Sequence, residues 1–174
     1  MIKDGKGGAN TLTGLHFEER ISLTTVFEKA NGYSVKGNEI YYGEQKVAEL
    51  YPKHKLYKEL LEPNNIDYTD FISKKLLPDD AIFIMKNKTL FIVEIKFQET
   101  AGSVDEKLQT CDFKNKQYTK LLSRIGITVR YTYVLNDWFK KPEYKDVLDY
   151  IKASNCYYFF NEIPFSFFDL PTPK

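Results

Sequence analysis

The 174-residue sequence contains few of the residues on which many metal sites and catalytic sites depend. Its two cysteines, Cys111 and Cys156, lie far apart and form no pair with the spacing of zinc ligands. Zinc is therefore not expected, and a reducing cytoplasm fits this cysteine usage. The two histidines, His16 and His54, are also isolated, which excludes metal or nucleophile schemes that need several imidazoles.

The chain also has no apolar run of membrane-spanning length, no signal peptide, no internal repeat and no low-complexity linker. We therefore expect a single cytoplasmic domain over residues 1–174 with no membrane partner. Hydrophobic residues make up 43% of the sequence, which is ample for one core. The net charge is only +1, so any surface that binds nucleic acid must come from a local cluster of lysines.

The most informative stretch is residues 77–96, which predicts a β-hairpin. Residues 81–85 form one apolar strand, residues 86–88 a polar turn, and residues 89–96 a second strand rich in β-branched and aromatic side chains. Because side chains alternate along a strand, Glu94 and Lys96 share one face. The opposite face is apolar enough to be core and carries Phe91, Val93, Ile95 and Phe97.

Charged side chains at the end of a buried hairpin are costly unless something holds them. Asp79, Glu94 and Lys96 are such a set, and a divalent cation would hold the two carboxylates while the lysine acts on a bound water. That arrangement suits phosphodiester hydrolysis. The alternative is a surface hairpin with an ordinary Glu–Lys pair, since acid-x-Lys tripeptides recur in this chain. Only Glu94-Ile95-Lys96 ends an apolar strand with Pro-Asp one hairpin upstream.

Pro78-Asp79 followed by Glu94-Ile95-Lys96 resembles the signature of the PD-(D/E)XK nuclease superfamily. The segment 14–18, Gly-Leu-His-Phe-Glu, resembles its first-helix acid motif, and segments 7–14 and 102–107 are similar to small type II restriction endonucleases. The resemblance covers about residues 7–136. It implies an α/β restriction-endonuclease-like core, in which helices flank a mixed central β-sheet in the order αβββαβ.

The resemblance also implies roles for the charged residues. Asp79 and Glu94 would hold Mg²⁺, with Mn²⁺ as a substitute, and Lys96 would deprotonate or position the water or stabilise the pentacovalent phosphate. Glu18 would support a second metal ion or its waters, although an acid in a first helical turn is also explained by the helix dipole. Asp80 follows Asp79, so the ligand register is open; Asp79 is preferred because it directly follows the proline.

Candidate DNA contacts follow the lysine strand. A capping box at residues 103–106 predicts a helix towards residue 126 whose lysines would reach phosphates, although such a helix is often only a solvated face. Gln98 continues the face of Glu94 and Lys96, or is an exposed strand-end amide. The predicted contacts are Gln98, Ser103, Lys107, Gln109 and Lys114.

The predicted domain has a flexible arm (1–13), a catalytic core (14–136) with an insertion (38–77), and a helix, strand and aromatic tail (137–174) for recognition or dimerisation. The predicted function is that of a Mg²⁺-dependent type II restriction endonuclease. It would act as a homodimer on double-stranded DNA, paired with a DNA methyltransferase. The alternatives are a junction-resolving or repair nuclease on the same fold, or a non-catalytic DNA-binding protein.

Overall fold

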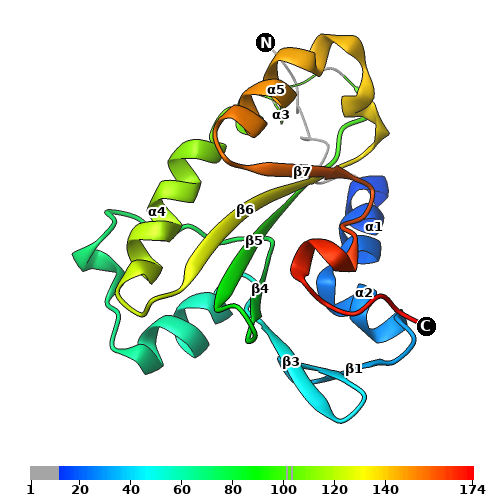
Figure 1. Ribbon diagram of the computed structural model, residues 1–174. Helices are drawn as coiled ribbons and strands as arrows, with labels where there is room; N and C mark the ends of the chain where they lie inside the picture. The colour runs from blue at the N-terminus through cyan, green and yellow to red at the C-terminus, as the bar shows by residue number, and fades with distance from the viewer. Residues whose placement is uncertain (1–11, 101, 103) are drawn as a thin grey trace.

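The fold is built on one seven-stranded sheet whose strands lie side by side in chain order (Figure 1). The computed structural model describes residues 12–100, 102 and 104–174, so residues 1–11 of the predicted arm and Ser103 lie outside the described residues. The strands are β1 (Tyr33–Lys36), β2 (Glu39–Tyr42), β3 (Gln45–Leu50), β4 (Asp80–Ile84), β5 (Thr89–Lys96), β6 (Thr128–Leu135) and β7 (Tyr157–Phe160).

The sheet is mixed because its two halves are connected differently. The strands β1 to β5 pair antiparallel, whereas β5, β6 and β7 pair parallel. Parallel neighbours need a crossover, and helices supply it between β5 and β6 and between β6 and β7. The predicted α/β class, a mixed central sheet flanked by helices, is confirmed.

The helices are shorter than the sequence pattern predicts. The apolar positions of residues 14–30 predict a single helix, but the structure breaks it at Ser22, whose backbone is extended (φ −56°, ψ 138°) and whose hydroxyl accepts a hydrogen bond from Thr25 N–H. None of the described helices is long and apolar enough to cross a membrane. The α-helices are α1 (Leu12–Ile21), α2 (Leu23–Lys29), α3 (Val104–Leu108), α4 (Cys111–Ser123) and α5 (Lys145–Ala153).

Single helical turns complete the connections. Leu56–Leu61 is π-helical, and 3₁₀ turns occur at Glu62–Asn64, Tyr68–Asp70, Asp137–Lys140, Pro142–Tyr144 and Phe165–Phe168. The sequence pattern of residues 68–77 predicts a helix, but only the turn Tyr68–Asp70 at its start is helical.

The sheet separates two hydrophobic cores, one on each face. On one face, α4, α5 and buried side chains of the segment 51–77 pack against the sheet. On the other face lie α1, α2 and the C-terminal residues, against Phe91, Val93, Ile95 and Phe97 of β5 and its extension. The apolar face that the alternation predicted is therefore core.

Residues 38–77, predicted as an insertion into the core, are not one separate unit. The first part forms β2 and β3, and β3 pairs directly with β4 through Ala48 and Ile84. Only residues 51–77 leave the sheet, and they cover one of its faces with Leu56, Tyr57 and Leu61. The hairpin of β2 and β3 therefore extends the central sheet.

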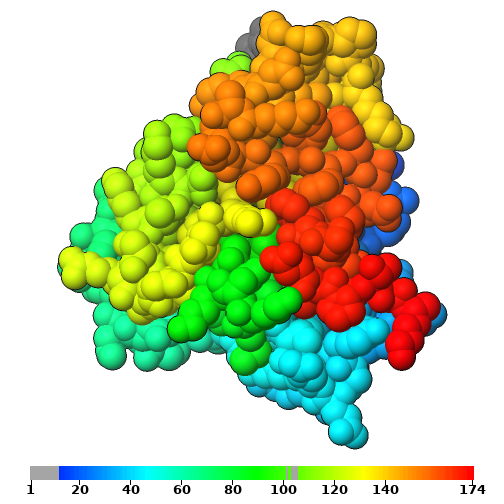
Figure 2. All heavy atoms as spheres, viewed as in Figure 1, coloured from blue at the N-terminus to red at the C-terminus, as the bar shows by residue number. Residues whose placement is uncertain are grey.

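The aromatic tail packs against its own chain. Phe168 is 2% exposed, and its ring lies 5.1 Å from that of Phe91 on β5. Polar contacts fix the C-terminal end of this segment, since Asn87 donates to Asp169 and Tyr33 donates to the Pro171 carbonyl. Figure 2 shows the red C-terminal residues against the green β4–β5 turn and the cyan N-terminal strands. The tail therefore covers part of the core of its own chain.

Substitution of Phe168 by alanine tests this packing. Phe168→Ala should lower the free energy of unfolding by about 3–5 kcal/mol, because it leaves a cavity against Phe91. The matched control is Phe113→Ala, since Phe113 is 59% exposed and its truncation should change stability by no more than about 0.5 kcal/mol. Urea denaturation gives both values. Equal stability of the two variants would contradict a core role for the tail.

Candidate active site

The register of the central hairpin brings two carboxylates together. Asp80 pairs with Val93, so Asp79, one residue before β4, comes beside Glu94, one residue further along β5. Asp79 Oδ2 accepts a hydrogen bond of 2.8 Å from the Ile95 N–H, which ties the residue before β4 to β5. The side chain of Asp79 is one-third exposed, whereas Glu94 is 4% exposed. One carboxylate is therefore open to solvent and the other is buried.

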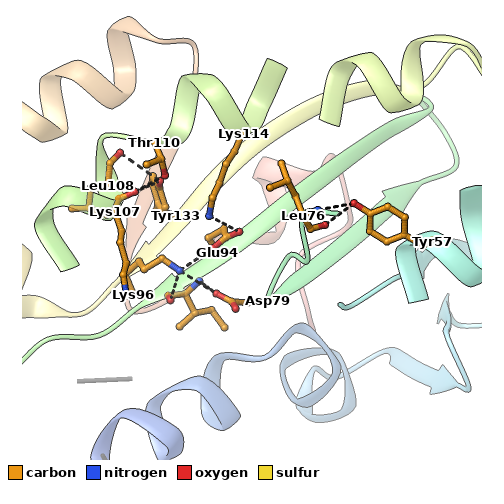
Figure 3. A network of polar contacts seen from close by, with 11 residues as sticks. Tyr57, Leu76, Asp79, Glu94, Lys96, Lys107, Leu108, Thr110, Lys114 and Tyr133 are labelled. Atoms are coloured by element: carbon orange, nitrogen blue, oxygen red, sulfur yellow. Dashed lines mark hydrogen bonds and ion pairs between the residues drawn. The ribbon is translucent and has the colours of Figure 1, made fainter. Parts of the chain in front are cut away.

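Lys96 bridges these two carboxylates (Figure 3). Its Nζ lies 2.8 Å from Glu94 Oε2 and 3.3 Å from Asp79 Oδ2. Burial lowers the pKa of the lysine, but the charges and hydrogen bonds of Glu94 and Asp79 outweigh burial and raise the pKa above its ordinary value. Lys96 is therefore an ammonium at neutral pH, held between the carboxylates of a buried site.

A second lysine reaches the buried carboxylate from the other side. Lys114, in the first turn of α4, places its Nζ 3.2 Å from Glu94 Oε1. The sequence predicts phosphate contacts for this lysine, and the structure places its ammonium on Glu94. Lys114 lies four residues before the buried Tyr118, so helical periodicity puts both on the sheet-facing side of α4. That spacing is the signal from which its position could have been found.

Asp80 points away from this cluster. Its Oδ2 accepts a 2.8 Å hydrogen bond from Leu23 N–H at the start of α2, and the residue is 3% exposed. Burial raises the pKa of Asp80 to about 6, with a further contribution from Asp79, while the Leu23 N–H and Lys53 oppose the rise. Of the two neighbouring acids, Asp79 is therefore the one that lies with Glu94 and Lys96.

Glu18 lies at the edge of the cluster. Burial has the largest effect and raises the pKa of Glu18. The nearby charge of Asp79 raises this pKa further, and the charges of Lys96 and Lys53 partly oppose the rise.

Lys53 lies next to the cluster, although no sequence pattern pointed to it. Its backbone N–H donates to the Pro78 carbonyl beside Asp79, and its φ of 51° is left-handed. Within the described part of the chain, no three His, Cys, Asp or Glu side chains are arranged to hold a metal ion.

The remaining predicted contacts lie in different surroundings. Gln98 is 2% exposed, so it is not an exposed strand-end amide, and its side-chain amide finds no hydrogen-bond partner among the described residues. Its backbone is held by Asn136 at the end of β6. Lys107 and Gln109 are exposed around the end of α3. Ser103 lies outside the described residues.

Comparisons with known proteins add little to this geometry. No protein-family model matches the chain, and no curated protein matches it. Among solved structures, MunI restriction endonuclease in complex with cognate DNA is similar at 14% sequence identity with a TM-score of 0.40. The match covers 68% of this chain and 75% of that one. Similarity at this level carries no inference about activity, which must rest on the site itself.

The buried Asp80 makes stability depend on pH. Its pKa is about 6 in the folded protein, against 3.8 as the reference value, so the folded state binds the proton more tightly. Stability from this group is present below about pH 4 and falls as the pH rises to about 6. Relative to wild type, Asp80→Asn should therefore gain about 2–3 kcal/mol between pH 4 and pH 7. Urea denaturation in EDTA at several pH values measures the difference, and a difference independent of pH would contradict this account.

Proposed function

We propose that this chain is a Mg²⁺-dependent nuclease that hydrolyses phosphodiester bonds of DNA. The observation that carries the proposal is the cluster of Asp79, Glu94 and Lys96, in which a lysine ammonium lies between two carboxylates. The order of Pro78-Asp79 and Glu94-Ile95-Lys96 on a β-hairpin also resembles the PD-(D/E)XK nucleases.

The donor set fits a hard divalent cation. The position of the Lys96 ammonium marks a place where a positive charge is stabilised by both carboxylates. Carboxylate oxygens are the ligands that Mg²⁺ prefers, and Mg²⁺ at phosphate sites is usually held by one or two carboxylates, with water and substrate phosphate completing its shell. The lack of a third side-chain ligand among the described residues is therefore compatible with Mg²⁺, or with Mn²⁺ in its place.

Each side chain would have a distinct part in hydrolysis. Asp79 and Glu94 would hold the cation, which when bound would lower the pKa of a water and polarise the phosphate. Lys96 would deprotonate or position the attacking water, or stabilise charge on the pentacovalent phosphate. Glu18 would orient water at the edge of the cluster, since it is close enough for Asp79 to raise its pKa.

The finer proposal is a type II restriction endonuclease that cuts double-stranded DNA at a short specific sequence. Segments 7–14 and 102–107 support this proposal because their sequences resemble those of small type II restriction endonucleases. Lys107 and Gln109 are exposed and available for DNA contacts. Cutting both strands in one encounter requires two active sites related by a two-fold axis, hence a homodimer. A partner DNA methyltransferase would protect the host's own sites.

Plasmid digestion distinguishes this function from its alternatives. Supercoiled plasmid incubated with Mg²⁺ should yield discrete linear fragments, with little nicked intermediate if the enzyme is a dimer. A smear, or cleavage restricted to four-way junctions, would favour a junction-resolving or repair nuclease on the same fold. DNA binding without any cleavage, with Mg²⁺ or Mn²⁺, would favour the non-catalytic DNA-binding protein.

The lysine between the carboxylates should matter to the reaction far more than to DNA binding. Lys96→Ala should lower kcat by about 10²–10³-fold, because the charge it supplies is needed most in the transition state. DNA affinity, measured with Ca²⁺ in place of Mg²⁺, should stay largely unchanged. Lys116→Ala is the matched control, since Lys116 is exposed and pairs with Asp112. Equal losses of binding and cleavage in Lys96→Ala would overturn the assigned role.

A further inference from the structure

Lys114 belongs to the buried centre rather than to the protein surface. Its side chain is 25% exposed, whereas the side chain of Glu94, its partner, is 6% exposed. By contrast, Lys116 on the same helix is 69% exposed and forms an ion pair with Asp112, one turn before it. The two lysines are two residues apart, yet only Lys114 reaches the sheet.

Lys96 and Lys114 bind different oxygens of the Glu94 carboxylate. Lys96 donates to Oε2 and also contacts Asp79, so it lies where the two carboxylates meet. Lys114 donates to Oε1, and Glu94 is the one carboxylate that its Nζ contacts among the described residues (Figure 3). A cation shared by Asp79 and Glu94 would compete with Lys96 for Oε2 but would leave the Lys114 contact in place.

The helix that carries Lys114 is firmly held. In α4, Cys111, Tyr118, Leu121 and Leu122 are fully buried against the sheet. The backbone N–H of Lys114 donates to the Thr110 carbonyl at the start of the helix. The backbone of Lys114 is therefore fixed, and its side chain extends from a fixed Cα towards Glu94.

We propose that Lys114 is a positioning residue for the cation centre. It holds Oε1 of Glu94 and thereby turns Oε2 towards Asp79, the orientation in which the two carboxylates share one cation. The inference rests on the proposed function, since it presumes that Asp79 and Glu94 bind a divalent cation. Without Lys114, Oε1 would lose its partner in a buried site, and the carboxylate would be free to turn away.

Cation binding in the absence of DNA tests this role directly. Titration calorimetry with Mn²⁺ should give an affinity about 10–100-fold weaker for Lys114→Met than for wild type, the usual effect of removing a group that orients a ligand. Lys114→Arg, which keeps the donor and the charge, should bind close to wild type. Lys116→Met is the matched control and should be unchanged. Lys114→Gln gives a second neutral variant in case the methionine variant does not fold.

The possible outcomes separate this inference from the function on which it rests. Unchanged or tighter Mn²⁺ binding in Lys114→Met, with wild type binding Mn²⁺, would overturn the positioning role alone. If the Lys114→Met variant bound Mn²⁺ like wild type but bound DNA more weakly, Lys114 would be a contact to DNA phosphates. Wild-type protein that binds no Mn²⁺ would overturn the proposed cation centre and this inference together. In cleavage assays, raised Mn²⁺ should restore kcat of Lys114→Met, with KM for DNA unchanged throughout.

Discussion

The buried negative charge of Glu94 is the constraint on which the centre depends. A carboxylate that is 4% exposed is costly unless charged partners and hydrogen bonds compensate it. Lys96 and Lys114 supply that compensation, one on each oxygen. Lys96 in turn draws in Asp79, because a single ammonium serves both carboxylates. The charges therefore hold one another in place, and a divalent cation would enter a site already built to stabilise positive charge.

The fold brings these groups together from three parts of the chain. The antiparallel hairpin places Asp79 beside Glu94, and alternation along β5 puts Lys96 on the same face. The crossover from β5 to β6 returns α4 over that face and delivers Lys114. On the other face, α1 carries Glu18 to the edge of the cluster, while Asp80 pins the start of α2 to β4. Helices α1 and α4 thus contribute side chains to the cluster, and α2 is anchored to the hairpin through Asp80.

Local patterns were enough to predict the hairpin and its two faces, because the period of a strand fixes which side chains share a face. Contacts between distant segments were not predictable in this way. The phase of α4 relative to the sheet decides whether Lys114 meets solvent or Glu94, and packing sets that phase. Burial of Gln98 likewise depends on the segment after β6, where Asn136 holds the backbone of Gln98. The break at Ser22 is not predictable from the local pattern, because its apolar neighbours continue a helical periodicity.

The central claim is that Asp79 and Glu94 form a divalent cation site, and crystals soaked in Mn²⁺ test it most directly. Anomalous scattering should reveal a Mn²⁺ ion coordinated by both carboxylates, with the Lys96 ammonium moved from its place between them and Lys114 still on Glu94. Glu94→Gln crystals soaked in the same way should lack the peak. A structure with Lys96 still bridging the carboxylates and no Mn²⁺ bound to them, at concentrations that support catalysis by metal-dependent nucleases, would contradict the account.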